Sequence, residues 1–184
     1  MLSREDALNL VRRYLNNEKI IKHSLAVEAI MRAVARRLSE DENLWGLVGL
    51  LHDLDYEYTE DDPVEHGIVA CQVLEGLLPE KGLNAIKAHN YKYTDQIPVR
   101  AIDKALIAAD AVSGLIMATA LVMPSKKLKE VKLETLLKKF EDKSFARGCD
   151  RRKISLCYDF GLTLREFLEI SLKAMQNISD ELGL

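Results

Sequence analysis

The chain has 184 residues, of which 48% are hydrophobic and 30% charged, with a formal net charge of −3. This fits one globular domain with a sizeable core, and the small net charge gives no global indication of a nucleic-acid or anionic-membrane partner. Three cysteines without a CxxC pair suit a reducing cytoplasm, and the N-terminal residues lack a signal-peptide pattern, so we expect a cytoplasmic protein.

Capping residues and apolar residues at helical spacing predict helices along the chain, and no segment alternates in the way a strand does. The first helix begins at Ser3, which with Asp6 resembles a capping box, and ends before Asn16-Asn17. Ser39 with Glu42 marks another helix start in the same way. We therefore expect an all-α domain whose first three helices cover Ser3 to Leu15, Glu18 to Leu38 and Asp41 to Leu54.

Two breaks interrupt the helical pattern after these helices. The acidic and aromatic stretch 55–61 has no helical stripe, so we expect a loop over the end of the preceding helix. Asp62-Pro63-Val64-Glu65 combines an N-cap, a proline at the first position and a glutamate at the third, which predicts a helix start. Pro79 ends that helix, and a shorter helix that carries His89 follows.

The stretch from Ala105 to Met123 is mostly apolar and close to the length needed to span a bilayer. It also contains Asp110, Ser113 and Thr119, which are costly in lipid. We therefore interpret it as a buried central helix of the core and expect no membrane partner.

Composition shifts after this long apolar helix. The segment 125–153 holds eleven Lys or Arg residues against five Asp or Glu residues. Thr163 with Glu166 then caps a final helix that is expected to pack back onto the bundle. We therefore expect a helical core over 1–123 and a basic helical extension over 124–184 that packs on it.

Five predicted elements each place a histidine, an aspartate or an adjacent pair on or beside the line that should face the core. Taken singly, each has an ordinary explanation as a satisfied core histidine or a buried hydrogen-bond acceptor. Together they are the nitrogen and oxygen ligands that transition metals prefer, and one buried metal site would satisfy them jointly. These residues are His23, His52-Asp53, His66, His89 and Asp110.

At these residues the chain resembles the HD-domain superfamily of metal-dependent phosphohydrolases. The order His, His-Asp, His, His, Asp matches its binuclear members over residues from about 18 to 117. The resemblance implies an all-helical core with the metal centre inside it, and activity on nucleotides or related phosphate esters. The matching sequence motifs are His23-Ser24, Leu50-Leu51-His52-Asp53, Glu65-His66-Gly67, Ala88-His89-Asn90 and Ala108-Ala109-Asp110.

The resemblance also implies residue roles. A second metal ion, which shares Asp53 as a bridge, would be bound by His66 and His89. The cofactor would be one or two divalent transition-metal ions, with Fe, Mn, Zn, Ni and Co all compatible. The ions would activate a water or hydroxide for in-line attack on phosphorus, which makes Asp53 the central catalytic residue. The first metal ion would have four protein ligands: His23, His52, Asp53 and Asp110.

The chain departs from the family pattern directly after the His-Asp pair, where many members have a motif with a basic residue, such as Ile-Gly-Lys. Here the continuation is Leu54-Asp55-Tyr56-Glu57, without a cation for the phosphate. This argues against carrying over a specificity for large cyclic dinucleotides. Asp55 or Glu57 could act as a general acid or bind a sugar hydroxyl, and a solvated acidic loop explains both equally well.

The basic segment 125–153 has three interpretations. The plainest is a solvated helical hairpin whose charges aid solubility. The segment could instead be a lid that brings cations to the phosphate, with Lys126 and Arg147 as the contacts and Gly148 permitting a tight turn. This interpretation predicts that Arg147→Ala or Lys126→Ala raises KM and leaves the metal content intact. Nucleic-acid binding is disfavoured, because few aromatic residues interleave the charges.

The leading hypothesis is therefore a metal-dependent phosphohydrolase that acts on a small phosphorylated metabolite, with a nucleotide favoured. Two alternatives stay open. A His/Asp di-iron oxygenase would show oxygen-dependent turnover, and a non-catalytic metal-stabilised or ligand-sensing domain would keep its ligands intact without turnover. The pattern does not choose between monoesterase and diesterase, and it leaves the oligomeric state open.

Overall fold

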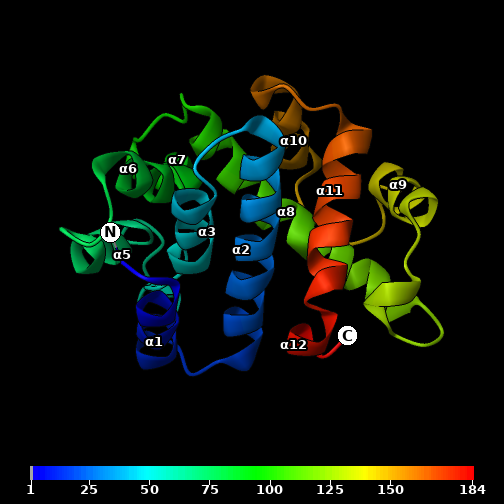
Figure 1. Ribbon diagram of the computed structural model, residues 1–184, viewed down its shortest axis with the longest axis horizontal. Helices are drawn as coiled ribbons and strands as arrows, with labels where there is room; N and C mark the ends of the chain where they lie inside the picture. Colours follow the sequence, from blue (N-terminus) through cyan, green and yellow to red (C-terminus); the bar gives the residue numbers. More distant parts are fainter. Residues whose placement is uncertain (1) are drawn as a thin grey trace.

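A computed structural model describes residues 2–184. Within these residues the chain forms twelve α-helices, two short 3-10 helices and no strand, which confirms the predicted all-helical class (Figure 1). The 3-10 helices are η1 (Leu128–Glu130) and η2 (Ser155–Phe160). The α-helices are α1 (Arg4–Tyr14), α2 (Glu18–Leu38), α3 (Glu42–Leu51), α4 (Tyr56–Thr59), α5 (Ile68–Leu74), α6 (Glu80–His89), α7 (Tyr91–Thr94), α8 (Ala101–Val122), α9 (Leu133–Glu141), α10 (Arg151–Ile154), α11 (Leu164–Asn177) and α12 (Ser179–Leu182).

Helix α2 is at the centre of the bundle and packs against α3, α8 and α11 (Figure 1). Val27, Ile30 and Val34, which lie on one face of this helix, are fully buried. The contact with α3 is close because Gly49 lacks a side chain. A Cβ at this position would lie 2.9 Å from the Val27 carbonyl oxygen. This close approach brings the end of α3, where His52 and Asp53 follow, against α2.

The long apolar helix α8 crosses the domain behind α2 and confirms the predicted central core helix (Figure 1). Among residues 2–184 it is the one helix long and apolar enough to cross a membrane by length and composition alone. Its most apolar window is 61% buried inside the domain. Leu106, Val112 and Leu115 are fully buried, as a core helix requires.

The predicted capping box at Ser39 and Glu42 is wrong. Ser39 is the C-cap of α2, in the left-handed region at φ 58°. Asp41 caps α3 instead, and its side chain accepts a hydrogen bond from the Leu44 N–H. The stretch 55–61, which was predicted to be a loop, contains the single helical turn α4.

The predicted helix start at Asp62 is also wrong. Residues 63–67 form turns, and α5 begins after Gly67, which has φ 85°. The cap comes from a distant residue, because the Asp55 carboxylate accepts the N–H groups of Gly67 and Ala70 at 2.7 and 2.8 Å. The buried residues of α5 are Ala70, Cys71 and Leu74, so His66 lies before this helix and not on its inward face.

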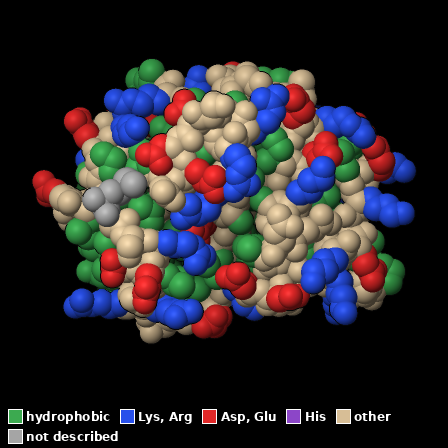
Figure 2. Space-filling model, viewed as in Figure 1, with side chains coloured by type: hydrophobic (Ala, Val, Ile, Leu, Met, Phe, Trp, Pro, Cys, Tyr) green, Lys and Arg blue, Asp and Glu red, His purple; other side chains and the backbone are tan. Residues whose placement is uncertain are grey.

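The C-terminal residues share one hydrophobic core with the helices before them. Helix α11 packs on α2, and its Phe167, Leu168 and Met175 are fully buried. The predicted capping box of Thr163 and Glu166 is present at its start. Acidic and basic side chains are interspersed over the face shown in Figure 2, as the small net charge suggests.

Candidate metal centre

The six predicted ligands lie together, although they come from five separate parts of the chain. Some of these residues lie within helices, and others lie at helix ends or in a turn. The residues are His23 in α2, His52 and Asp53 directly after α3, His66 in the turn before α5, His89 at the end of α6, and Asp110 in the middle of α8.

Asp53 is the centre of this cluster. Its Oδ2 lies 3.5 Å from His23 Nε2, while its Oδ1 lies 3.3 Å from His52 Nε2. The same Oδ1 is 3.4 Å from His66 Nε2 and 3.6 Å from His89 Nε2. The two carboxylate oxygens therefore face different sets of histidines, as a bridging carboxylate would.

The two most buried histidines are oriented by backbone carbonyls. His52 Nδ1 donates to the Gly49 carbonyl at 2.8 Å, and His89 Nδ1 donates to the Ile86 carbonyl. Both acceptors lie three residues earlier on the helix that carries the histidine. Because the Nδ1 atoms carry the protons, each ring presents an unprotonated Nε2 to the cluster.

The other two histidines are oriented by side chains. His66 Nδ1 donates to Asp55 Oδ1 at 2.9 Å. His23 Nδ1 lies 3.1 Å from Ser113 Oγ, whose own hydroxyl donates to the Asp110 carbonyl, so this nitrogen is the donor. Outer hydrogen bonds of this kind set the tautomer and the orientation of histidines that bind metals.

Among the described residues, three of the inward Nε2 atoms have only one another or an aspartate oxygen as partners, and the fourth has none. His52 Nε2 is buried without a hydrogen-bond partner in the described part of the chain. The Nε2 atoms of His66 and His89 face each other at 3.0 Å. Two groups have ligand atoms close enough to share one ion, and both include Asp53: His23, His52 and Asp53, and Asp53, His66 and His89. A metal ion in either place would satisfy these atoms.

The charges within the cluster support this chemistry. Burial lowers the pKa of His52 to about 4, so its ring is neutral. Burial also acts to lower the pKa of His66, but its hydrogen bonds with Asp53 and Asp55 outweigh this effect and raise the pKa to about 10. The His66 ring therefore holds a second proton when no ion is bound, and coordination through Nε2 would release it.

The two aspartates remain ionised in spite of their position. Burial acts to raise the pKa of Asp110, but the hydrogen bond with His23 outweighs it and holds the pKa at about 2. Asp110 Oδ1 lies 3.2 Å from His23 Nε2. Burial has the same effect on Asp53, whose pKa is nevertheless held well below its ordinary value by the nearby histidines, His52 foremost. The cluster thus keeps two anionic ligands at neutral pH.

The structure places Asp55 beside the cluster and Glu57 away from it. All three hydrogen bonds of the Asp55 carboxylate go to His66, Gly67 and Ala70, and the residue is 1% exposed. The Glu57 carboxylate accepts the N–H groups of Asn16 and Asn17 at 2.8 and 2.6 Å, before the start of α2. Asp55 is therefore positioned to hold His66, and Glu57 is positioned to hold the α1–α2 turn.

Neither cation chosen from the basic segment is brought to the cluster. Lys126 follows the end of α8, and the twelve helical steps from Asp110 to Val122 cover about 18 Å along the helix axis. The side chain of Arg147 is exposed and does not line the cleft at the cluster. The neighbouring residues 148–150, together with Lys153, do line it.

The cleft has a volume of about 230 Å³ and opens at His23 and Asp110. Its opposite wall comes from the end of the basic segment and includes Cys149, Asp150 and Lys153. Gly114, one turn after Asp110 in α8, permits this contact, because a Cβ there would lie 3.0 Å from Cys149 Sγ. Lys153 is thus the one Lys or Arg side chain among the described residues that line this cleft. The excess of basic residues in this segment was visible in the sequence, but the position of Lys153 at the cleft was not.

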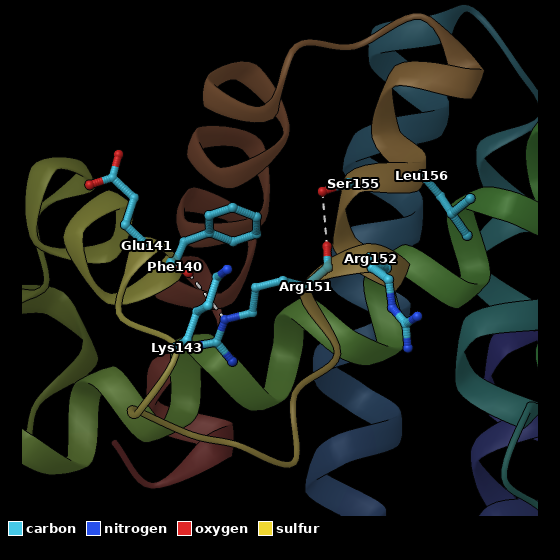
Figure 3. A pocket seen from close by; sticks show the side chains of 7 residues that line it. All are labelled: Phe140, Glu141, Lys143, Arg151, Arg152, Ser155 and Leu156. Atoms are coloured by element: carbon cyan, nitrogen blue, oxygen red, sulfur yellow. Dashed lines mark hydrogen bonds between the residues drawn. The ribbon is translucent and has the colours of Figure 1, made fainter.

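Arg151 holds this wall in place. Its guanidinium donates hydrogen bonds to six backbone carbonyls, at 2.7 to 3.2 Å. Figure 3 shows the side chain reaching from α10 toward the end of α9, whose last carbonyls it caps. One arginine therefore ties together α9, the loop 142–149 and α10. The accepting carbonyls belong to Lys139, Phe140, Asp142, Phe145, Ala146 and Cys149.

Arg151→Ala is expected to lower the free energy of unfolding by about 2–3 kcal/mol, because several carbonyls lose a charged donor. It should also loosen the loop 142–149, so that limited trypsin digestion cuts faster after Lys143 and Arg147. Denaturant unfolding and mass spectrometry of the digest measure both effects. Arg151→Lys keeps the charge but not the planar fork, so we expect an intermediate result. Unchanged stability and unchanged digestion of Arg151→Ala would contradict this role.

The fold and the cluster define an all-helical domain whose buried histidines and aspartates could hold metal. Residues 20–115, which are 96 of the 184 residues, match the HD domain family. The chain therefore belongs to the HD-domain family, whose members are mostly metal-dependent hydrolases. Comparisons with curated proteins and with solved structures gave no match.

Proposed function

We propose that this protein is a metal-dependent phosphohydrolase that acts on a small phosphate ester, with a nucleotide as the favoured substrate class. One observation carries the proposal. The four histidines all turn Nε2 toward the Asp53 carboxylate, and the buried His52 Nε2 has no partner in the described part of the chain. Divalent ions bound there supply Lewis-acid charge and an activated water for attack on phosphorus.

The proposal gives each side chain a role. His23, His52 and Asp110 would hold one ion and His66 and His89 the other, with Asp53 shared between them. Asp55 and Ser113 would keep the rings of His66 and His23 in the tautomer that leaves Nε2 free, as their hydrogen bonds indicate.

The cleft at His23 and Asp110 would take the phosphate. Lys153 on its opposite wall would contact a phosphoryl oxygen, because Lys and Arg cations neutralise the negative charge of phosphate groups. This keeps the idea that the basic segment closes the site, but it assigns the contact to Lys153 in place of Lys126 and Arg147. The partner is then a small phosphorylated molecule, and the roughly 230 Å³ of the cleft suits a phosphate with part of its ester group.

The test is phosphate release from a panel of nucleotides and sugar phosphates by protein loaded in turn with Mn, Fe, Co, Ni or Zn. We expect turnover to rise with metal content and to require no dioxygen. Lys153→Ala should raise KM by roughly tenfold with little change in metal content, as for one lost charge-assisted contact. Glu57→Gln is the control and should behave like the parent. Absence of phosphate release from every ester by fully loaded protein, or turnover that depends on dioxygen, would overturn the proposal.

A further inference from the structure

A second hollow adjoins the cleft at the metal centre. It has a volume of about 250 Å³, and its lining shares Asp150 and Lys153 with the lining of the cleft. The two hollows therefore meet at these residues. The full lining of the second hollow is Tyr91, Lys92, Asp150, Arg152, Lys153 and Leu156.

One wall of this hollow is formed by residues that come soon after His89 in the sequence. Tyr91 and Lys92 come two and three residues after His89, at the start of α7. The opposite wall comes from α10, which also carries Lys153. This hollow between α7 and α10 is therefore the space next to the cleft for a molecule longer than the cleft itself.

The hollow has an excess of positive charge. Lys92, Arg152 and Lys153 face a single carboxylate, that of Asp150. Asp150 is already engaged as the N-cap of α10, where it accepts the Arg152 N–H at 2.9 Å. Among residues 2–184, neither Lys92 nor Lys153 forms an ion pair.

Arg152 is available to a ligand even though it lies near Asp150. The guanidinium contacts this carboxylate only at 3.4 Å, and its side chain is 90% exposed. Exposed pairs of this kind contribute little to stability. Figure 3 shows Arg152 pointing away from the contacts that hold its neighbour Arg151, on the side of Leu156.

We propose that this hollow is a second anion subsite, which binds a negatively charged group of the substrate other than the phosphate that is hydrolysed. The substrate class is thereby a phosphate ester that also carries a second phosphate or a carboxylate. Tyr91 and Leu156 give the apolar surface for the part of the molecule between the two groups. The inference rests on the proposed function, because that proposal assigns the reacting phosphate to the cleft at His23 and Asp110.

Binding of non-hydrolysable phosphonates to Mn²⁺-loaded protein tests the subsite. Propylphosphonate and 1,3-propanediphosphonate differ by one anionic group, and 1,4-butanediphosphonate adds one methylene. Calorimetry at constant ionic strength gives the dissociation constants. We expect at least one diphosphonate to bind the parent protein ten times or more tighter than propylphosphonate, as for one added charge-assisted contact.

Two double variants, each lacking two cations, separate the subsite from general charge attraction. Lys92→Ala with Arg152→Ala should bring the ratio of the two dissociation constants near one and leave propylphosphonate binding unchanged. Lys126→Ala with Lys127→Ala loses the same charge in exposed residues outside the hollow and should keep the parental ratio. A parental ratio within twofold of one, or the same loss in both double variants, would overturn the subsite.

The outcome is independent of turnover, because the carbon–phosphorus bonds are not hydrolysed. Preferential diphosphonate binding by protein that hydrolyses no ester would support the subsite and overturn the proposed reaction. Hydrolysis of esters by protein that shows no such preference would overturn the subsite alone.

Discussion

Asp53→Ala is expected to remove metal from both positions of the cluster and to lower kcat/KM for phosphate esters by roughly three orders of magnitude or more. The reason is that both groups of ligand atoms include this carboxylate. Its loss also removes the one carboxylate that all four histidine Nε2 atoms approach. Metal analysis of folded protein, with circular dichroism to establish folding, measures the effect.

Asp110→Ala is the matched comparison, because Asp110 approaches His23 alone among the four histidines. We expect it to weaken the position at His23 and His52 and to leave the position at His66 and His89 occupied. Folded Asp53→Ala protein with the metal content of the parent would contradict the shared role of Asp53.

Asp55→Ala has the second largest expected effect. The buried carboxylate accepts hydrogen bonds from His66, Gly67 and Ala70, so its loss leaves two N–H groups without their acceptor and removes the anion that holds the His66 ring. We expect the free energy of unfolding to fall by about 3 kcal/mol or more. Metal affinity at the His66 position should fall roughly 10- to 100-fold, as for other outer partners of metal-binding histidines.

The pH dependence of kcat separates this positioning role from the general-acid role that the sequence left open. A positioning residue changes metal affinity and stability and leaves the shape of the pH profile intact once the metal is saturating. Asp55→Asn retains an oxygen acceptor and should be less affected than Asp55→Ala. A stable, fully loaded Asp55→Asn protein that loses the alkaline limb of the profile would show that Asp55 acts as the acid instead.

Helix ends that depend on residues nearby in the sequence were predicted closely. Helix α2 has the predicted bounds 18–38, and α11 begins at the predicted Thr163–Glu166 box. These signals are local, so the sequence pattern contains them. The start of α5 was missed because its cap is Asp55, which lies twelve residues before Gly67 and accepts its N–H. The helix-start pattern Asp62-Pro63-Val64-Glu65 carries no information about that contact.

The residue types of the cluster and the helix faces that carry them also follow from the local sequence pattern. The structure brings the six residues together, with Asp53 at the centre. The partners that orient the rings were not predictable. Ser113 meets His23 across two helices, and the Gly49 and Ile86 carbonyls meet His52 and His89 through helix geometry.

Lys126 and Arg147 were chosen from the sequence as the cations of the basic segment, whereas Lys153 lines the cleft in the structure. The segment does reach the cluster, but only after it has left the far end of α8 and returned. Its return path depends on the six carbonyl contacts of Arg151 and on the close approach of Cys149 to Gly114. These contacts place Lys153, not Lys126, at the cleft.

Anomalous diffraction from crystals of metal-loaded protein tests the central claim most directly. The account predicts two anomalous peaks on either side of the Asp53 carboxylate. One should lie within bonding distance of His23 and His52, and the other within bonding distance of His66 and His89. A loaded crystal with no peak among these residues, or with its metal bound elsewhere, would contradict the account.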